Sequence, residues 1–186
     1  MKTKKLVFFY DIIILGSDTM NYVIRPRTKE DCKAIAHVVA ISWNETYKGI
    51  VPDWFLEELK EKEDERAMKA YNAFDMDPNK HLVLDVDNEV VGFVNFGKSL
   101  DPNYEDCGEI IALYIINKYK GNGFGRKLVE EAKKELKKMG YNQMIIACLK
   151  GNPTNEFYKH IGGVYVKDGL FKRLQLEENI YFYDQI

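Results

Sequence analysis

The feature that most constrains the fold is an apolar run, residues 110–116, followed by a glycine-rich turn at residues 120–126. The turn leads into a segment with helical periodicity that ends at Gly140. Backbone N–H groups at a helix start have no partner within the helix and lie at the positive end of its dipole. Glycines allow a ligand to approach that backbone closely. The segment therefore predicts a strand, a turn and a helix with an anion site, most naturally for a phosphate or pyrophosphate.

A second apolar run, residues 144–149, follows the helix that we expect over residues 123–139. Two continuous apolar strands joined by one long helix predict a parallel, right-handed βαβ unit. We expect this helix to bury Leu128, Val129, Ala132, Leu136 and Met139.

The rest of the chain alternates between strand and helix patterns. Strands are expected at residues 22–26, 81–85, 90–96, 109–116, 164–166 and 180–183. Asp87 and Asn88 predict the turn of a hairpin. Helices are expected from Thr28, as N-cap, to Gly49, from Pro52 into the charged residues 60–66, and over residues 153–161. The fold class predicted is α/β, with a mixed, mostly antiparallel sheet around a central parallel βαβ unit.

Composition limits the classes of function. The chain has 186 residues and a formal net charge of -2, which favours one domain and gives no support to nucleic-acid binding. Its three cysteines are far apart without a CxxC pair, which argues against a disulfide framework or structural zinc and fits a reducing cytoplasm. Only His160 has a carboxylate, Glu156, one helical turn away, so no metal is expected.

The first 19 residues differ from the rest. Lysines precede an apolar run at residues 6–15 that contains Asp11. The run is too short to span a membrane, and neither an uninterrupted apolar centre nor a clear cleavage site indicates a signal peptide. We therefore expect an N-terminal extension of unclear role at residues 1–19, one domain at residues 20–186, and no membrane partner.

The glycine loop matches neither of two common phosphate-binding motifs. A P-loop requires GxxxxGK[ST], which the chain lacks. A dinucleotide fingerprint requires GxGxxG, and here Arg126 occupies the position of its last glycine.

The remaining pattern, K-G-x-G-x-G-R, resembles the signature of the GNAT superfamily of acetyl-CoA-dependent N-acetyltransferases, [Q/R]-x-x-G-x-[G/A]. Gly123 and Gly125 match it, and Lys120 stands in the Gln/Arg position. A second block, residues 152–163, resembles the family's N…FYxxxGG ending. Residues 24–26 and 43–52 are similar to one large subgroup, so the resemblance covers about residues 20–186.

The resemblance implies a GNAT-like acyl-CoA N-acyltransferase fold and an enzyme. Its reaction would be direct transfer of an acetyl group from acetyl-CoA to a primary amine of a small molecule or a protein N-terminus. Two alternatives are open: a longer acyl-CoA as donor, and a non-catalytic acyl-CoA-binding or regulatory module that keeps the fold.

The resemblance also implies roles for individual residues. Acetyl-CoA would lie between the fourth and fifth strands, against Leu113, Tyr114, Ile115, Lys120, Gly121, Asn122, Gly123, Phe124, Gly125, Arg126, Asn152 and Tyr158. Tyr158 would protonate the leaving thiolate, and Asn152 would hold the pantetheine arm, with Asn155 as a nearby competitor.

The base and the acceptor site are less defined. Glu109 begins the fourth strand and is either a base acting through water or a polar residue at a strand end. Trp43 and Tyr47 would line the acceptor pocket, although Trp43 equally suits the core. The apolar leader and the aromatic last strand are candidates for the edge of a homodimer.

Overall fold

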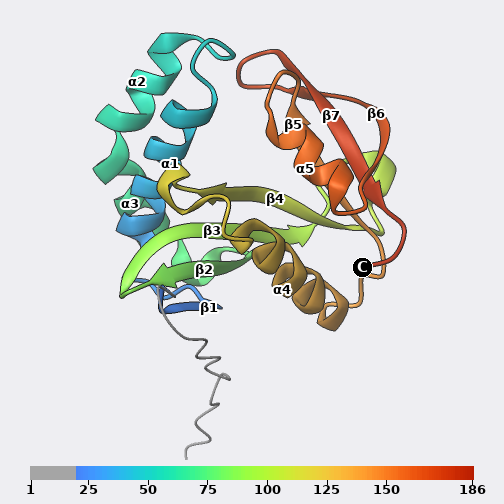
Figure 1. Cartoon of the computed structure of the whole chain (residues 1–186), viewed down its shortest axis with the longest axis horizontal. Helices are drawn as coiled ribbons and strands as arrows, with labels where there is room; N and C mark the ends of the chain where they lie inside the picture. Colours follow the sequence, from blue (N-terminus) through green and yellow to red (C-terminus); the bar gives the residue numbers. More distant parts are fainter. Residues whose placement is uncertain (1–19) are drawn as a thin grey trace, which may run out of the picture.

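The computed structural model describes residues 20–186, whose strands form one seven-stranded sheet in the order β1-β2-β3-β4-β5-β7-β6 (Figure 1). The strands are Tyr22–Pro26 (β1), Lys80–Val86 (β2), Glu89–Lys98 (β3), Gly108–Ile115 (β4), Met144–Leu149 (β5), Val164–Phe171 (β6) and Leu176–Tyr183 (β7). The helices are Cys32–Thr46 (α1), Asp53–Glu61 (α2), Glu63–Asn72 (α3), Phe124–Lys138 (α4) and Thr154–His160 (α5). Only β4 and β5 pair in parallel, which confirms the predicted mixed sheet. The predicted N-terminal extension lies outside the described residues.

The hairpin between β2 and β3 forms as predicted. Asp87 and Asn88 both have positive φ, 52° and 68°. Two consecutive left-handed residues are what a two-residue hairpin turn of type I′ requires, and Asp and Asn tolerate that conformation. The turn thus sets the register that starts at Val86↔Glu89.

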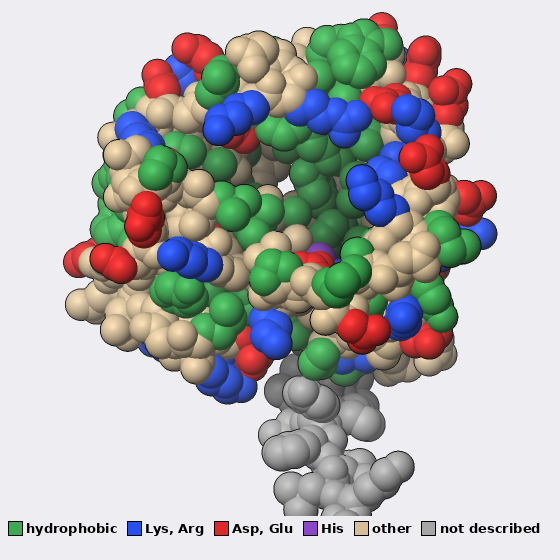
Figure 2. Space-filling view, turned by 180° about the vertical axis from the view of Figure 1, so that it is seen from behind, with side chains coloured by type: hydrophobic (Ala, Val, Ile, Leu, Met, Phe, Trp, Pro, Cys, Tyr) green, Lys and Arg blue, Asp and Glu red, His purple; other side chains and the backbone are tan. Residues whose placement is uncertain are grey.

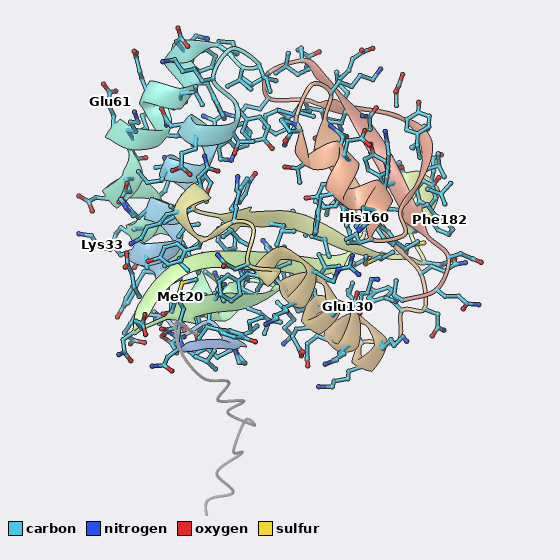
Figure 3. All side chains as sticks on the ribbon, in the orientation of Figure 1. Met20, Lys33, Glu61, Glu130, His160 and Phe182 are labelled. Carbon is cyan, nitrogen blue, oxygen red and sulfur yellow. The ribbon has the colours of Figure 1, made fainter. Side chains whose placement is uncertain are left out.

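Helices cover both faces of the sheet. Leu128, Val129 and Leu136 of α4 are completely buried in the largest hydrophobic cluster, which also contains Tyr158 of α5. On the opposite face, Val38 of α1 packs against β2 and β3. In Figure 3, Glu130 and His160 mark α4 and α5, whereas Lys33 and Glu61 mark the α1–α2 side.

Met139 is predicted to join the core, but it does not. It is 38% exposed because α4 ends at Lys138 and Met139 is the C-cap. Gly140 follows in the left-handed conformation, φ 97°, as expected of a glycine that ends a helix.

The first helix also differs from its prediction. It begins at Cys32, not after Thr28, and the Asp31 carboxylate accepts a hydrogen bond from the Thr28 N–H at 2.6 Å. Arg25 of β1 holds the same carboxylate through two hydrogen bonds, at 2.7 and 3.0 Å. The helix ends at Thr46, before the predicted stop at Gly49, and residues 63–72 form the separate helix α3.

The expectation that the last strand forms a sheet edge is wrong. β7 lies between β5 and β6, and its backbone pairs on both sides. The edge at this end of the sheet is β6, which exposes Val164 and Leu170.

The position of the site is set by a separation of β4 and β5. Their register covers only Gly108↔Met144, Glu109↔Ile145 and Ile110↔Ile146, after which no pairing follows. β4 stays paired to β3 through a register shift at Asn95/Phe96, while β5 continues along β7. The second half of β4 therefore has a free edge toward β5, next to the start of α4 (Figure 1).

Candidate active site

The start of α4 has the geometry of an anion site. Gly123 is the N-cap in the left-handed conformation, φ 75°, and Gly121 has φ 82°. A side chain is strained at such angles, which explains glycine at both positions. The helix begins at Phe124, so the N–H groups of its first turn have no intrahelical acceptor. No acidic side chain lies in that turn, which leaves the positive end of the dipole available.

Two cations lie beside these amides. Arg126, in the first turn of α4, and Lys120, before the glycines, both line the adjoining cavity. Burial lowers the pKa of Lys120, and its ammonium donates to Thr46 Oγ1 at 3.3 Å. Both cations are placed to pair with an anionic ligand at the helix start.

One cavity of about 380 Å³ connects the helix start with the gap between β4 and β5. Of the predicted residues, it is lined by Tyr47, Leu113, Tyr114, Ile115, Lys120, Gly121, Gly123, Phe124, Gly125, Arg126, Asn152 and Tyr158. Asn122 is not among them, because its side chain turns back to donate to the Tyr119 carbonyl at 3.1 Å. The structure thus brings together residues from α1, β4, α4 and α5.

Tyr158 of α5 lies deep in this cavity and is only 5% exposed. The Tyr183 hydroxyl donates to the Tyr158 carbonyl at 3.0 Å, which ties α5 to β7. Burial, together with the neighbouring Cys148 and Tyr114, raises the pKa of the Tyr158 hydroxyl well above its ordinary value. The phenol therefore keeps its proton and is available as a donor.

Asn152 is held from two sides. Its Nδ2 donates to the Tyr47 hydroxyl at 2.9 Å, and its Oδ1 accepts from the Thr154 N–H at 2.8 Å. These bonds join the start of α5 to the end of α1 across the cavity wall. The competitor Asn155 is structural: it donates to the carbonyls of Leu149 and Asn152.

Trp43 and Tyr47 occupy different positions. Tyr47 lines the cavity, and its ring centroid lies 4.4 Å from that of Trp43. Trp43 does not line the cavity but packs against Phe55 in the cluster formed by α1 and α2. It supports Tyr47 from behind.

Glu109 lies outside the cavity lining. It is 8% exposed, and its Oε2 accepts from the Leu100 N–H at 2.7 Å. Burial raises the pKa of this carboxyl. Its contacts favour the second of the two interpretations above, a polar residue that anchors a loop at a strand end.

Sequence reasoning missed four lining residues: Ser42, Thr46, Thr154 and Phe157. Ser42 had one detectable signal, because a serine interrupts the apolar face of α1. Its Oγ is buried and, within residues 20–186, has no hydrogen-bond partner. The other three lie inside the blocks that carry the family resemblance, Thr46 in residues 43–52 and Thr154 and Phe157 in residues 152–163, but the motifs gave none of them a role.

Residues 20–186 contain no group of three His, Cys, Asp or Glu side chains placed to hold a metal ion. In the same part of the chain, every helix is too short or too polar to cross a bilayer. Cys32, Cys107 and Cys148 are free and buried.

Comparisons with known proteins agree on one family. Residues 43–163 match the model of the acetyltransferase (GNAT) family. The chain is 30% identical over 138 residues to an uncharacterized N-acetyltransferase of Bacillus subtilis (strain 168), YuaI, covering 73% of this chain and 76% of that protein.

Solved structures with the same fold include proteins bound to coenzymes. PaiA N-acetyltransferase of Thermoplasma acidophilum, in complex with coenzyme A, has a TM-score of 0.70 at 23% identity, covering 88% of this chain and 100% of that one. A similar structure is YncA of Salmonella typhimurium, a putative acetyltransferase with acetyl-CoA, with a TM-score of 0.62 at 20% identity and coverage of 88% and 93%.

Proposed function

The chain belongs to the acetyltransferase (GNAT) family, and on this premise we propose that acetyl-CoA occupies the cavity beside α4. Its pyrophosphate lies on the amides that follow Gly121, with Lys120 and Arg126 as cationic partners. The protein is an acetyl-CoA-dependent N-acetyltransferase that moves the acetyl group directly to a primary amine. The acceptor is a small molecule or a protein N-terminus.

One observation carries this proposal. A single cavity connects an anion-binding helix start with a buried tyrosine, along the edge of β4 that β5 leaves unpaired. A coenzyme whose pyrophosphate and thioester are joined by an extended arm requires such a layout. The coenzyme A and acetyl-CoA named for the similar structures fit the same chemistry.

Tyr158 supplies the proton that the departing sulfur requires. Its raised pKa keeps the phenol protonated at neutral pH, and the cavity gives its hydroxyl access to a ligand. The oxyanion of the tetrahedral intermediate lies near Tyr114, because backbone groups on the free edge of β4 have no strand partner there. Asn152 acts through the bond to Tyr47, which holds both side chains on the wall next to the pantetheine arm.

The test is a thiol-release assay with acetyl-CoA and a panel of amines, polyamines, aminoglycosides and peptides, alongside calorimetric titration with acetyl-CoA. We expect Tyr158→Phe to lower turnover by about 10²–10⁴-fold, the usual contribution of a general acid, with little change in acetyl-CoA affinity. Tyr165→Phe is the matched control, since Tyr165 is exposed on β6 and its hydroxyl donates to Asp168.

Undiminished turnover in Tyr158→Phe would show that another group protonates the thiolate. A wild-type protein that binds acetyl-CoA but releases no thiol with any amine would indicate a non-catalytic module. No association with acetyl-CoA at millimolar concentration would overturn the whole proposal.

Two further points belong to the proposal. We expect a homodimer through the edge strand β6, whose exposed Val164 and Leu170 suit pairing with another copy, and sedimentation analysis tests it. We also expect a cytoplasmic location, because buried free thiols such as Cys148 suit a reducing compartment, and fractionation of cells tests it.

A further inference from the structure

The proposed reaction requires a group that takes a proton from the acceptor amine, and Glu109 is poorly placed for it. Its carboxylate accepts a hydrogen bond from the Leu100 N–H and is nearly fully buried. A second carboxylate, Glu178 of β7, lies on the same face of the sheet, and the sequence analysis did not single it out.

The face is established by strand register. Leu149 of β5 pairs with Glu178 of β7, and directly paired residues project from the same face. Leu149 belongs to the cluster of α1 and α2 that includes Tyr47. The next residue, Asn179, points the other way and donates to Asn155 near α5. Glu178 therefore lies on the α1–α2 face, opposite the α4–α5 face.

This face is open at its centre. Figure 2 shows it hollowed, with hydrophobic side chains lining the hollow. Ala112 of β4 and Ala147 of β5, both small and only partly buried, lie on this face where the two strands separate. An acceptor that enters here would approach the gap between β4 and β5 from the face opposite α4 and α5.

Glu178 is not tied down as Glu109 is. In the described part of the chain, neither a hydrogen bond nor an ion pair holds its carboxylate. Its partner on β6 is Gly169, which has no side chain to cover it. The carboxylate is thus half-buried and free to accept a proton.

Glu178 does not line the cavity itself, but the charge of its carboxylate acts on two residues at or near the cavity. After burial, the Glu178 carboxylate contributes to the raised pKa of Tyr114 and of Cys148, which is raised to about 12. Burial and the Glu109 carboxylate raise the pKa of Glu178 itself, and no cation opposes them. A carboxylate in this setting attracts an ammonium group, and its raised pKa makes it a better proton acceptor than an ordinary glutamate.

We propose that Glu178 is the general base of the transfer reaction and that Glu109 positions the loop at residues 99–107. The inference rests on the proposed function. Glu178 takes the first proton from the acceptor ammonium and releases it to water. The freed nitrogen then forms the C–N bond with the thioester carbonyl. As the C–S bond breaks, Tyr158 protonates the sulfur, and the second nitrogen proton replaces the one that Tyr158 gave.

The test compares pH profiles of kcat/KM for the wild-type chain, Glu178→Gln and Glu177→Gln, using the best amine from the panel. Glu177 is the control because it is the adjacent, exposed glutamate, paired with Lys150. We expect the wild-type profile to fall on the acidic side with a pKa above that of an ordinary glutamate. Glu178→Gln should lose about 10²–10⁴-fold in kcat and lack this acidic limb. Glu177→Gln should retain both.

Calorimetry with acetyl-CoA verifies that Glu178→Gln is folded. Should it not fold, Glu178→Asp replaces it, with the acidic limb retained and kcat reduced. An unchanged kcat and acidic limb in Glu178→Gln would overturn the assignment. A rise in KM alone would also overturn it, because it would show that Glu178 only binds the ammonium group of the acceptor. In both cases the active wild type would leave the proposed function standing, whereas an inactive wild type that binds acetyl-CoA overturns both.

Discussion

The left-handed turn before α4 makes a quantitative prediction about Gly123. Its φ is 75°, and an added Cβ would have no atom within 4 Å, so an alanine there meets backbone strain and no clash. Left-handed backbone costs a residue with a Cβ roughly 1–2 kcal/mol. For a chain of this size that corresponds to a fall in Tm of about 2–8 °C, at 2–4 °C per kcal/mol.

Gly125 is the matched control because it lies two residues further, inside α4 with helical φ. Its added Cβ would lie 3.4 Å from Phe157 Cζ, an ordinary contact. Replacing a helical glycine with alanine stabilises by roughly 0.5–1 kcal/mol. Urea denaturation without ligand should therefore separate Gly123→Ala from Gly125→Ala by about 1.5–3 kcal/mol, with opposite signs relative to wild type. Equal stabilities would refute the left-handed turn.

Three other predictions concern stability. Tyr47→Phe removes the acceptor of the buried Asn152 amide and should cost about 1–3 kcal/mol in urea denaturation; a neutral result would mean that the bond is absent in solution. Leu128→Ala deletes a completely buried side chain and should cost about 2–5 kcal/mol; a loss below 1 kcal/mol would contradict its position in the core. Burial opposes ionisation of Asp31, but Arg25 and the Thr28 N–H lower its pKa on balance. This stabilisation is present above the unfolded pKa of about 3.9 and disappears as pH falls through the lower folded pKa. The free energy of unfolding of Asp31→Asn should therefore fall less steeply at acidic pH than that of the wild type, and an equal fall would contradict the pairing.

The elements that sequence reasoning predicted well are those with local causes. Asp87 and Asn88 adopt the positive φ that their hairpin requires. The helix that follows Gly123 has the expected apolar face, with Leu128 and Leu136 completely buried. Such features depend on steric limits and periodicity within one or two turns, which the residue order specifies.

The wrong predictions involve contacts between distant segments. The helix α1 begins at Cys32 and not after Thr28, although the Asp31 carboxylate accepts the Thr28 N–H as a capping box requires. Arg25 of β1 binds the same carboxylate and ties the chain before α1 to the sheet. The last strand was predicted to be an edge, but β6 pairs with its outer side. Nothing in the sequence of the last strand indicates that pairing. A strand's position in a sheet depends on its partners, which local pattern does not contain.

The residue order alone determined that a bare, glycine-rich turn opens a helix and presents unpaired amides to an anion. The site around that turn depended on tertiary structure. Separation of β4 and β5 created the cavity, and the bond between Asn152 and Tyr47 joined two helices across it. The Leu100 N–H binds the Glu109 carboxylate and leaves Glu178, within residues 20–186, as the carboxylate of the two without such a bond. A glycine's φ is a property of one residue, whereas a side chain's freedom depends on neighbours that only strand pairing and packing bring within reach.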